Sequence, residues 1–545
     1  MRMSRDRTQR NTILILLLLS LLYFVLFIPP NMAASKNLAM VSVFEPDEDA
    51  ELRYALDMIR PTDNFKNALI QFFFYKFYFY GFPHFAYSAA LLLPLRWLNL
   101  LENTSLVMVI LRQMVSLLPL LAAIWILVYL QTRFKGYRAI LLFIFLISLP
   151  VVFRNNFWWH PDGLAILFAI LAIFFLERDD LRFGKNFYLS AAMCGFSAAT
   201  KGIGLYFFLA IVVYLVLGLF YRKFAFKKIL ISAIGFLACM GVAYLLAIPI
   251  LVYPGIRERY FQAMTTAYTN VSQGYELGYA RGFSVAVESI LRDYATPLFL
   301  ILVLVACVWA IARDQRRLLH IIILAWLIPI SFLVSFIMHY KFQYWLPVGL
   351  PLFSTFIVFF PENIKLEKPA SSGRRQWLLW LAVAIVAFQF AQNISRDVKM
   401  YSDRLFREQT SPAIGFYDRV EETLKPLPPI RGYHVYHDVR MYVPSRPDWY
   451  CESIFEMLDY AYLQEKWFDV ILLRQQRILD YLNPAAIVLD AAKLEASQAF
   501  YRDAQDGKIQ GYRLLYRDEY GLIFVRDRLY ENYFQTVSVV STPTP

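Results

Sequence analysis

Up to about residue 392, the chain alternates between long apolar runs and short polar breaks, and beyond that point charges are frequent and apolar runs are short. The long runs hold roughly 17 to 25 residues, the length that a helix needs to cross a bilayer. We therefore predict a polytopic α-helical membrane domain over residues 1–395. Residues 396–535 are predicted to form a soluble extracytoplasmic α/β domain, and residues 536–545 a disordered tail.

Basic residues between the apolar runs predict how the chain is oriented, because loops on the cytoplasmic side carry an excess of Lys and Arg. The segments that we place in the cytoplasm are 1–11, 133–138, 177–185, 222–228, 313–317 and 365–375. Each neighbouring pair beyond residue 133 encloses enough apolar sequence for a hairpin of two spans. The resulting count is 11 spans, with the N-terminus in the cytoplasm and the C-terminal domain outside.

Two apolar segments allow a different interpretation. The first run, Ile13–Ile28, precedes a passable signal-peptide cleavage site at Met32-Ala33-Ala34-Ser35, but its length and the spans that follow favour an uncleaved span. An odd number of spans must separate the first outer loop from the cytoplasmic segment 133–138. The apolar run that follows Phe82–Leu98 supplies one span, so Phe82–Leu98 cannot be another. Its Pro83, His84, Pro94 and Arg96 suit a helix that lies along the membrane surface.

Composition narrows the function classes. Of the 545 residues, 59% are hydrophobic and only 18% are charged, and the net charge is +12. The basic residues lie in short loops between spans, so they indicate membrane orientation and we expect no nucleic-acid partner. The four cysteines include no CxxC pair, so neither a zinc site nor a disulfide framework is indicated.

A dense acidic cluster, Glu45, Asp47, Glu48 and Asp49, follows the first span. Like charges this close raise some pKa values, which suits a carboxylate for general-base catalysis. The same residues also suit a solvated turn that caps a helix over Ala50–Ile59, because Asp and Glu favour helix N-termini. A third interpretation is a divalent-cation site, which would need His160 or a backbone carbonyl to complete its ligands.

Four further polar breaks interrupt the predicted hairpins and should face the same side as the acidic cluster: 154–162, 200–202, 254–293 and 339–343. Asp162 lies at the mouth of a span, where an ionisable residue is functional by default, although a helix N-terminus also favours an acid. Lys201 and Lys341 either reach towards anionic headgroups or bind a lipid phosphate, with His339 and Tyr340 as further donors. The long break 254–293, rich in Tyr and Gly, is interpreted as a loop that covers substrate or as a surface-lying amphipathic segment.

In combination these motifs resemble the GT-C superfamily of integral-membrane glycosyltransferases, in particular relatives of protein O-mannosyltransferases and of the lipid A aminoarabinose transferase. The resemblance is carried by Asp47-Glu48-Asp49 before Arg53-Tyr54-Ala55, Tyr80-Gly81-Phe82-Pro83-His84, Arg112, His160-Pro161-Asp162, Thr200-Lys201-Gly202 and Lys341-Phe342-Gln343-Tyr344. Each motif alone is weak evidence for this superfamily. Their order along the chain and their predicted location on one side of the membrane make the combination moderately specific.

The resemblance implies an inverting transfer of a sugar from a polyprenyl phosphate to an acceptor hydroxyl, with the first outer loop holding the base. By this analogy Asp47 corresponds to the base, with Glu48 and Asp49 as rivals, and Asp162 is the second acid. Lys201, Lys341 and His84 would bind the donor phosphate, although Pro83 before His84 weakens that match. Substrate contacts are expected from Arg53, Tyr54, His160 and Tyr344.

Lysines that neutralise the leaving phosphate and a carboxylate that takes the acceptor proton suffice for this displacement. No cofactor is expected to be required, and a divalent metal is possible but not indicated. The sequence contains no Gly-rich phosphate loop followed by Lys and Ser or Thr. Other candidates are a transporter or flippase of a lipid-linked glycan, and a different membrane transferase. The sugar, the acceptor (lipid, glycan or protein) and the oligomeric state stay open.

The C-terminal domain is predicted to contain strands over 432–436 and 470–473, a hairpin over 512–516 and 521–525, and helices over 412–424 and 484–500. Its only metal candidate, His434 with His437 and Asp438, does not converge on a strand whose neighbours alternate faces. We expect this domain to recognise the acceptor or to cover the active site.

Overall fold

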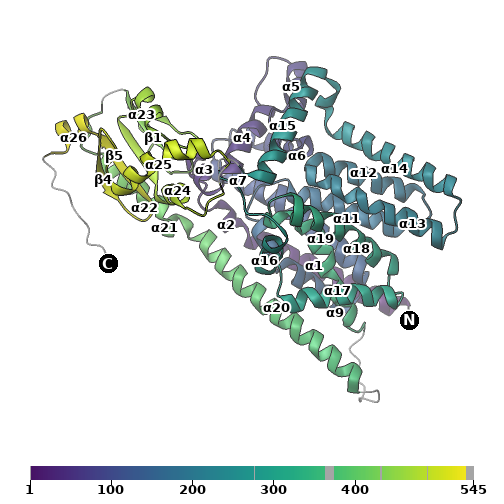
Figure 1. Cartoon of the computed structure of the whole chain (residues 1–545). Coiled ribbons are helices and arrows are strands. Elements are labelled where there is room, and N and C mark those ends of the chain that lie inside the picture. Colours follow the sequence, from purple (N-terminus) through teal and green to yellow (C-terminus); the bar gives the residue numbers. More distant parts are fainter. Residues whose placement is uncertain (1, 275–276, 363–372, 430–431, 488, 536–545) are drawn as a thin grey trace. The chain divides into compact units, whose positions relative to one another are not determined.

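The computed structural model describes residues 2–274, 277–362, 373–429, 432–487 and 489–535, and the predicted tail lies outside them (Figure 1). The chain divides into two compact units. The helical unit comprises Met1–Ala33, Glu51–Ser272 and Arg281–Leu405. The α/β unit comprises Ala34–Ala50, Gln273–Ala280 and Phe406–Pro545, so it adds two short segments to the C-terminal domain. Each unit is described below by itself.

Every apolar run that we assigned to a span is helical. In chain order these runs form α1 (Arg2–Leu26), α7 (Thr104–Leu111) with η1 (Arg112–Leu117) and α8 (Leu118–Thr132), α9 (Gly136–Ile147), α11 (Asp162–Asp179), α12 (Lys185–Thr200), η2 (Gly202–Ala210) with α13 (Ile211–Tyr221), α14 (Phe226–Ala247), α17 (Pro297–Ala312), α18 (Arg317–Phe332) with η4 (Leu333–Ile337), α19 (Leu346–Phe353) with η6 (Ser354–Phe359), and α20 (Gly373–Leu405).

Among the described residues, six helices are long and apolar enough to cross a membrane, or seven if the bent pair α16 (Phe283–Asp293) and α17 is one span. The axes of that pair meet at 95°. Two other helical segments, α9 and α19 with η6, are apolar but shorter. The chain is therefore a multi-pass membrane protein in composition, while the count of 11 spans and the orientation of its termini stay predictions.

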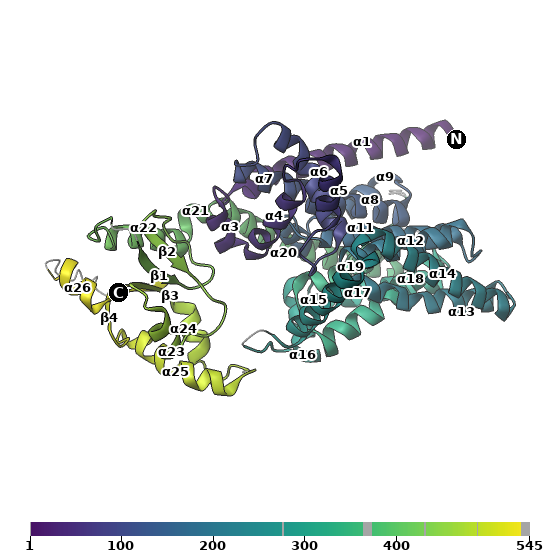
Figure 2. The ribbon, with the colours of Figure 1, turned by 90° about the horizontal axis from the view of Figure 1, so that it is seen from above.

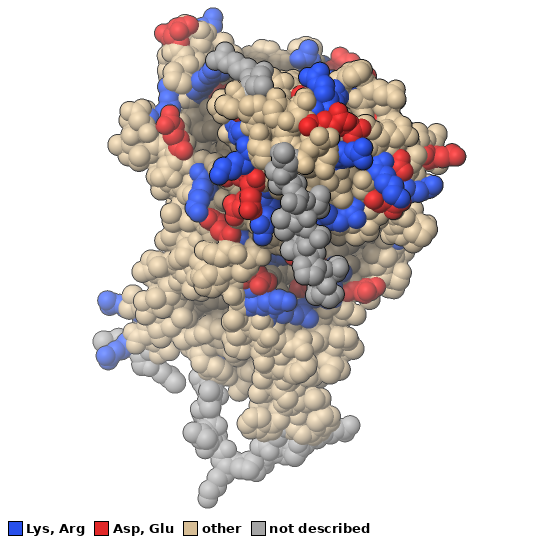
Figure 3. Space-filling model, turned by 90° about the vertical axis from the view of Figure 1, so that its left-hand side faces the viewer, with Lys and Arg blue, Asp and Glu red and all other residues tan. Residues whose placement is uncertain are grey.

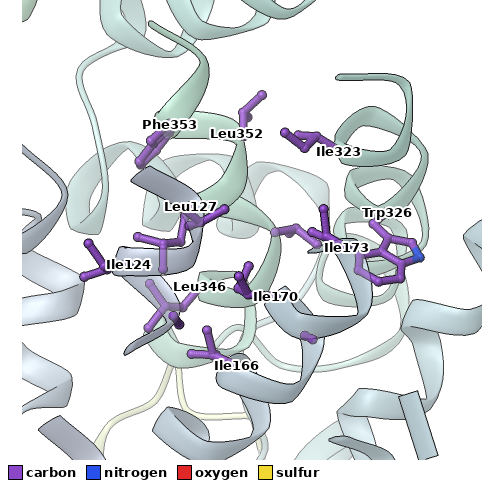
Figure 4. Close-up of a cluster of buried hydrophobic side chains, with 14 of the residues drawn as sticks. Ile124, Leu127, Ile166, Ile170, Ile173, Ile323, Trp326, Leu346, Leu352 and Phe353 are labelled. Atoms are coloured by element: carbon purple, nitrogen blue, oxygen red, sulfur yellow. The ribbon is translucent and has the colours of Figure 1, made fainter. Parts of the chain in front are cut away.

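The core of the helical unit lies between α8, α11, α18 and α19, whose branched aliphatic and aromatic side chains interdigitate (Figure 4). Ile166, Ile170 and Ile173 recur along α11 at the spacing of one helix face and meet Leu127 of α8 and Trp326 of α18. At the start of α11, Gly163 lies against the π-helix η1, where a Cβ would come within 2.4 Å of the Ser116 carbonyl oxygen. This close packing fixes where α11 begins.

The segment between α1 and α7 holds helices that the sequence indicated only in part: α2 (Ile28–Met32), α3 (Leu38–Phe44), α4 (Pro46–Met58), α5 (Phe65–Phe73) and α6 (Phe82–Trp97). Helix α6 corresponds to the predicted surface helix, and buries its His84, Phe85 and Ser88 face. Whether α6 lies along the membrane stays a prediction.

The predicted outer loop over 254–293 is mostly helical where the structure describes it. Pro254–Gln273 forms α15 and Phe283–Asp293 forms α16, preceded by the short η3 (Pro249–Val252). Proline at the first helical position suits the start of α15. Both interpretations, a segment that covers substrate and an amphipathic segment on the membrane surface, stay predictions.

The α/β unit contains a five-stranded sheet in the order β2-β1-β3-β5-β4. The strands are β1 (Tyr433–His437), β2 (Trp449–Glu452), β3 (Val470–Arg474), β4 (Tyr512–Arg517) and β5 (Gly521–Arg526). Strands β2, β1 and β3 are mutually parallel, and β4 with β5 is the predicted antiparallel hairpin.

Helices cover both faces of this sheet (Figure 2). On one face lie α22 (Pro412–Thr423) and α26 (Asp527–Tyr533), and on the other α23 (Tyr460–Lys466), α24 (Gln475–Leu482) and α25 (Ala491–Asp506). The face of the molecule in Figure 3 carries interspersed positive and negative side chains. The predicted α/β class is correct, but β2, α23, α24 and α26 were not anticipated.

Candidate active site

A buried ion pair joins two of the predicted site residues. The ammonium group of Lys201 donates to both carboxylate oxygens of Asp162, at 2.7 and 2.9 Å. Asp162 is 2% exposed and Lys201 is 8% exposed. Asp162 begins α11, where a negative charge favours the helix dipole, and Lys201 directly follows the end of α12. Because α11 and α12 are antiparallel neighbours, residues 39 apart in sequence meet at one end of the unit.

His160 extends this pair into a chain of hydrogen bonds. Its Nδ1 bonds to Asp162 Oδ2, and its Nε2 lies 2.7 Å from the hydroxyl of Tyr80. The imidazole stacks on the ring of Trp158, with centroids 3.9 Å apart. The backbone is held as well, since the His160 N–H donates to Ser116 Oγ at 3.1 Å. The break at 154–162 thus ends in an ordered turn that holds Asp162 and His160 beside Lys201.

Gly81 explains how Tyr80 reaches this cluster. The Gly81 N–H donates to the carbonyl of Thr200 at 3.1 Å, so the two breaks are joined by their backbones. A Cβ on Gly81 would fall 1.4 Å from the Ala199 carbonyl oxygen, which no side chain tolerates. Only glycine permits this approach.

A second buried pair lies beside the first. Nε2 of His84 in α6 is 2.9 Å from Glu51 Oε2 in α4, and both side chains are fully buried. The His84 ring stacks on Trp159, with centroids 5.3 Å apart, and Trp159 Nε1 donates to Ser88 Oγ at 3.0 Å. His84 is therefore enclosed by protein and bonded to a carboxylate, an arrangement that supports the site rather than contacts a phosphate.

Tyr344 connects the second predicted lysine to the cluster. Lys201 Nζ lies 5.1 Å from the centroid of the Tyr344 ring and Lys341 Nζ lies 5.9 Å from it, so both cations interact with one aromatic ring. Lys341 is half-buried and Tyr344 is buried. The break at 339–343 also contacts the break at 154–162, because Arg154 lies over the Phe342 ring at 4.1 Å.

The two other residues predicted in that break make contacts with α15 and α16, Tyr340 through its side chain and His339 through its backbone. The Tyr340 hydroxyl donates to Asp293 Oδ2 at 3.0 Å, and the His339 N–H donates to the Val271 carbonyl at 3.4 Å. Neither contact involves the Asp162 cluster. These two residues join η5 (Phe342–Tyr344) and its neighbours to the ends of α15 and α16.

The acidic cluster forms the first turn of α4, where Asp47, Glu48 and Asp49 face the positive end of the helix dipole. Glu48 is fully buried, and Asp47 and Asp49 are half-buried. All three belong to the α/β unit, whereas Glu51 and the following turns of α4 belong to the helical unit. The helix begins at Pro46 and not at Ala50, so the acids form its first turn rather than a solvated turn that caps it, and their catalytic role stays a prediction.

Arg53 and Tyr54, predicted substrate contacts, lie further along α4. Arg53 is exposed, and the Tyr54 ring packs on Phe77 with centroids 5.1 Å apart. Tyr54 also lines a cavity of about 110 Å³ with Arg60 and Lys76. This cavity is too small for a lipid-linked sugar.

The cluster of Asp162, His160, Lys201, Tyr80, Tyr344 and Lys341 therefore brings four of the predicted breaks and motifs to one place. A carboxylate that accepts from an ammonium group and an imidazole is a weak base, so the geometry suits Asp162 to hold Lys201 rather than to accept a proton. Among the described residues, no three His, Cys, Asp or Glu side chains are grouped to hold a metal ion.

Sequence reasoning did not assign roles to Tyr80 and Glu51, although both stand in the motifs that it considered. Glu51 follows Glu48 by three residues, a spacing that places both on one face of a helix. Tyr80 precedes Gly81, whose backbone contact with α12 is visible only in three dimensions.

Searches with known protein families and with curated proteins give no match. Two solved structures of ArnT from Cupriavidus metallidurans, a lipid A aminoarabinose transferase, are similar to this chain at 12% identity. The structure bound to undecaprenyl phosphate has a TM-score of 0.52 and a match over 94% of this chain and 97% of ArnT. The apo structure has a TM-score of 0.51, over 94% and 98%.

The archaeal oligosaccharyltransferase AglB from Archaeoglobus fulgidus, in complex with an inhibitory peptide and a dolichol-phosphate, is similar at 12% identity with a TM-score of 0.44. That match covers 92% of this chain and 79% of AglB. ArnT belongs to the GT-C superfamily. The resemblance read from the sequence is thus confirmed at the level of the fold.

Proposed function

We propose, from the premise that the chain has the fold of GT-C glycosyltransferases, that it moves a sugar from a polyprenyl-phosphate donor to an acceptor hydroxyl. The transfer takes place on the extracytoplasmic side and inverts the anomeric carbon. The solved ArnT structure with undecaprenyl phosphate supports a donor of this chemical class. The acceptor is a lipid, a glycan or a protein.

The observation that carries the proposal is the pair of lysines on one tyrosine ring. Lys201 and Lys341 lie 5.1 and 5.9 Å from the Tyr344 ring centroid, and Lys201 is held there by Asp162. Two ammonium groups beside one aromatic ring define a positively charged position that fits a phosphate diester. The ring also limits how far either lysine can turn away.

In the reaction, the acceptor oxygen attacks the sugar C1 as the bond from C1 to the phosphate oxygen breaks. Lys201 and Lys341 stabilise the charge that develops on the leaving polyprenyl phosphate. Asp162 and His160 fix Lys201 in position, with Tyr80 supporting the imidazole. The acceptor proton passes to a carboxylate of the first outer loop, with Asp47 as the first candidate and Glu48 and Asp49 as its rivals.

The test uses the purified full-length protein, a panel of undecaprenyl-phosphate sugars and a mixture of lipid and glycan acceptors. Mass spectrometry should detect a product whose mass has increased by one sugar, with release of undecaprenyl phosphate. Proteoliposomes loaded with the same donors separate transfer from transport. Movement of unchanged donor across the bilayer without product would overturn the proposal in favour of a flippase.

Single-residue variants then test which side chains bind the donor phosphate and which accepts the acceptor proton. Lys341→Gln should raise the KM for donor, since it removes one cation from the phosphate position. Lys66→Gln in α5, which is exposed, is the matched control and should behave as wild type. Asp47→Asn, Glu48→Gln and Asp49→Asn are made separately, with exposed Asp63→Asn as control. If all three keep wild-type turnover, the base is not in this cluster.

A further inference from the structure

A cavity of about 530 Å³ opens at the end of the helical unit away from Asp162. It lies where α11, α13 and α18 end or begin, and Leu217, Tyr221, Arg222, Arg316, Arg317 and Leu319 are among the residues that line it. Helix α11 has 18 residues, so at about 1.5 Å per residue this cavity is roughly 27 Å from the candidate active site. Its volume is that of a small-molecule site.

Arg316 is the unusual residue of this cavity. It precedes α18 with a left-handed backbone, at a φ of 50°. The Nη1 atom of its guanidinium group is buried and has no hydrogen-bond partner among the described residues. Burial, followed by repulsion from Arg133, lowers the pKa of Arg316 to about 10. A buried guanidinium donor without an acceptor is costly, and an anion is the group that satisfies it.

The other charges at the cavity are largely matched. Glu177 pairs with Arg133, and Asp180 pairs with Arg222. This leaves Arg316 and Arg317 facing one further carboxylate of the lining, that of exposed Asp314. Arg317 also lies 5.0 Å from the centroid of the Tyr221 ring. The lining itself has three arginines and three carboxylates, and Arg133, which pairs with Glu177 from outside the lining, leaves one positive charge in excess beside an aromatic ring.

An apolar stripe runs along α13, the helix whose Leu217 and Tyr221 line this cavity. Val212, Val216 and Phe220 follow one another at intervals of four residues, and are 61%, 43% and 71% exposed. Side chains at that spacing share one face of a helix. In a multi-pass membrane protein such an exposed face is covered by lipid chains, and it ends at Arg222. A ligand that carries both a phosphate and long acyl chains fits the arginines and the stripe together, whereas free phosphate fits only the arginines.

We propose that this cavity binds the phosphate headgroup of an anionic phospholipid, with Arg316 as the principal donor and the α13 stripe in contact with an acyl chain. Basic pockets between membrane helices are a known setting for anionic headgroups. The site is separate from the candidate active site and holds whether or not sugar transfer is found.

The test is native mass spectrometry of the full-length protein in detergent micelles with added phosphatidylglycerol or phosphatidylcholine of equal chain length. Wild-type protein should retain one phosphatidylglycerol in clear preference to phosphatidylcholine. Arg316→Gln should weaken phosphatidylglycerol binding about tenfold, the value of one charge-assisted contact. Arg182→Gln is the matched control, because Arg182 is exposed in the loop between α11 and α12 and does not line the cavity.

Four results overturn the proposal. One is equal binding by Arg316→Gln and wild type, and another is an equal loss of both lipids, which would indicate apolar contact alone. A third is competition by sn-glycerol 3-phosphate at the concentration of the lipid, which would assign the site to a free phosphate. If Arg316→Gln does not give monodisperse protein, Arg317→Gln replaces it, and unchanged binding by that variant is the fourth.

Discussion

Replacing Asp162 by Asn tests whether Lys201 depends on its carboxylate. Asparagine keeps the shape of the side chain and removes its charge. The carboxylate accepts from the Lys201 ammonium at 2.7 and 2.9 Å, and neither residue is more than 8% exposed. The variant therefore leaves a buried cation with a neutral partner.

The cost follows from burial rather than from attraction between the charges. Removing one partner of a buried ion pair costs about 3 to 5 kcal/mol, because the remaining charge stays desolvated. Lys201→Met should cost a comparable amount, since Asp162 then keeps only His160. In the double variant neither charge remains, so its loss should be about 1 to 3 kcal/mol smaller than the sum of the single losses.

The assay follows thermal unfolding of the purified protein in detergent by intrinsic fluorescence, together with product formation. Asp162→Asn should lower the apparent melting temperature by about 5 °C, and the double variant should recover part of this loss without regaining transfer. Exposed Asp63→Asn is the control for the chemical change. Strict additivity of the two single losses would show that the pair is not energetically coupled and would refute the reasoning.

Three further predictions concern neighbouring groups and the sheet. Gly81→Ala should prevent accumulation of folded protein, measured by size-exclusion profile, because its Cβ would fall 1.4 Å from the Ala199 carbonyl oxygen. Tyr80→Phe should retain folding, lose about 1 kcal/mol of stability in thermal unfolding and reduce turnover, since only the hydroxyl on His160 Nε2 is removed. Burial lowers the pKa of His437, so the unfolded chain binds the proton more readily than the folded chain. Stability of the sheet should thus fall as pH drops below about 6.5, and His437→Gln should flatten that dependence in pH-resolved unfolding.

Hydrophobic length and periodicity predict much of this fold because both are local. All the apolar runs assigned to spans became helices, and the Tyr512–Arg517 and Gly521–Arg526 hairpin is marked by its turn at Asp518. Strand β2 was not predicted from the sequence, because it is only four residues long and lies at a sheet edge with Tyr450 and Cys451 exposed. The helices within 254–293 were not predicted, because glycines and tyrosines have low helix propensity in isolation. Packing in the folded protein overrides that propensity.

The sequence predicted which residues belong to the candidate site, but it did not predict which of them contact one another. Charge parity placed Asp162 and Lys201 on one side of the membrane, yet only the antiparallel packing of α11 on α12 makes them partners. His84 was assigned to the donor phosphate by the family resemblance, and that role stays untested. The structure instead encloses it against Glu51, which α4 presents three residues after Glu48. A residue's type gives its chemistry, whereas its neighbours decide whether that chemistry is available.

The two proposed phosphate positions stand at opposite ends of α11. Asp162 begins that helix beside the lysines, and Asp179, its last residue, lies next to the arginine-lined cavity. Their separation of roughly 27 Å is close to the thickness of a hydrocarbon core, about 30 Å. By the topology predicted from the sequence, a lipid phosphate at one position belongs to the leaflet opposite to a lipid phosphate at the other. For this reason a donor bound at Lys201 and Lys341 cannot occupy the Arg316 site at the same time. Variants at the two ends should consequently affect transfer and phospholipid retention independently, and a Lys341→Gln protein that retains phosphatidylglycerol as wild type does is the result that this geometry requires.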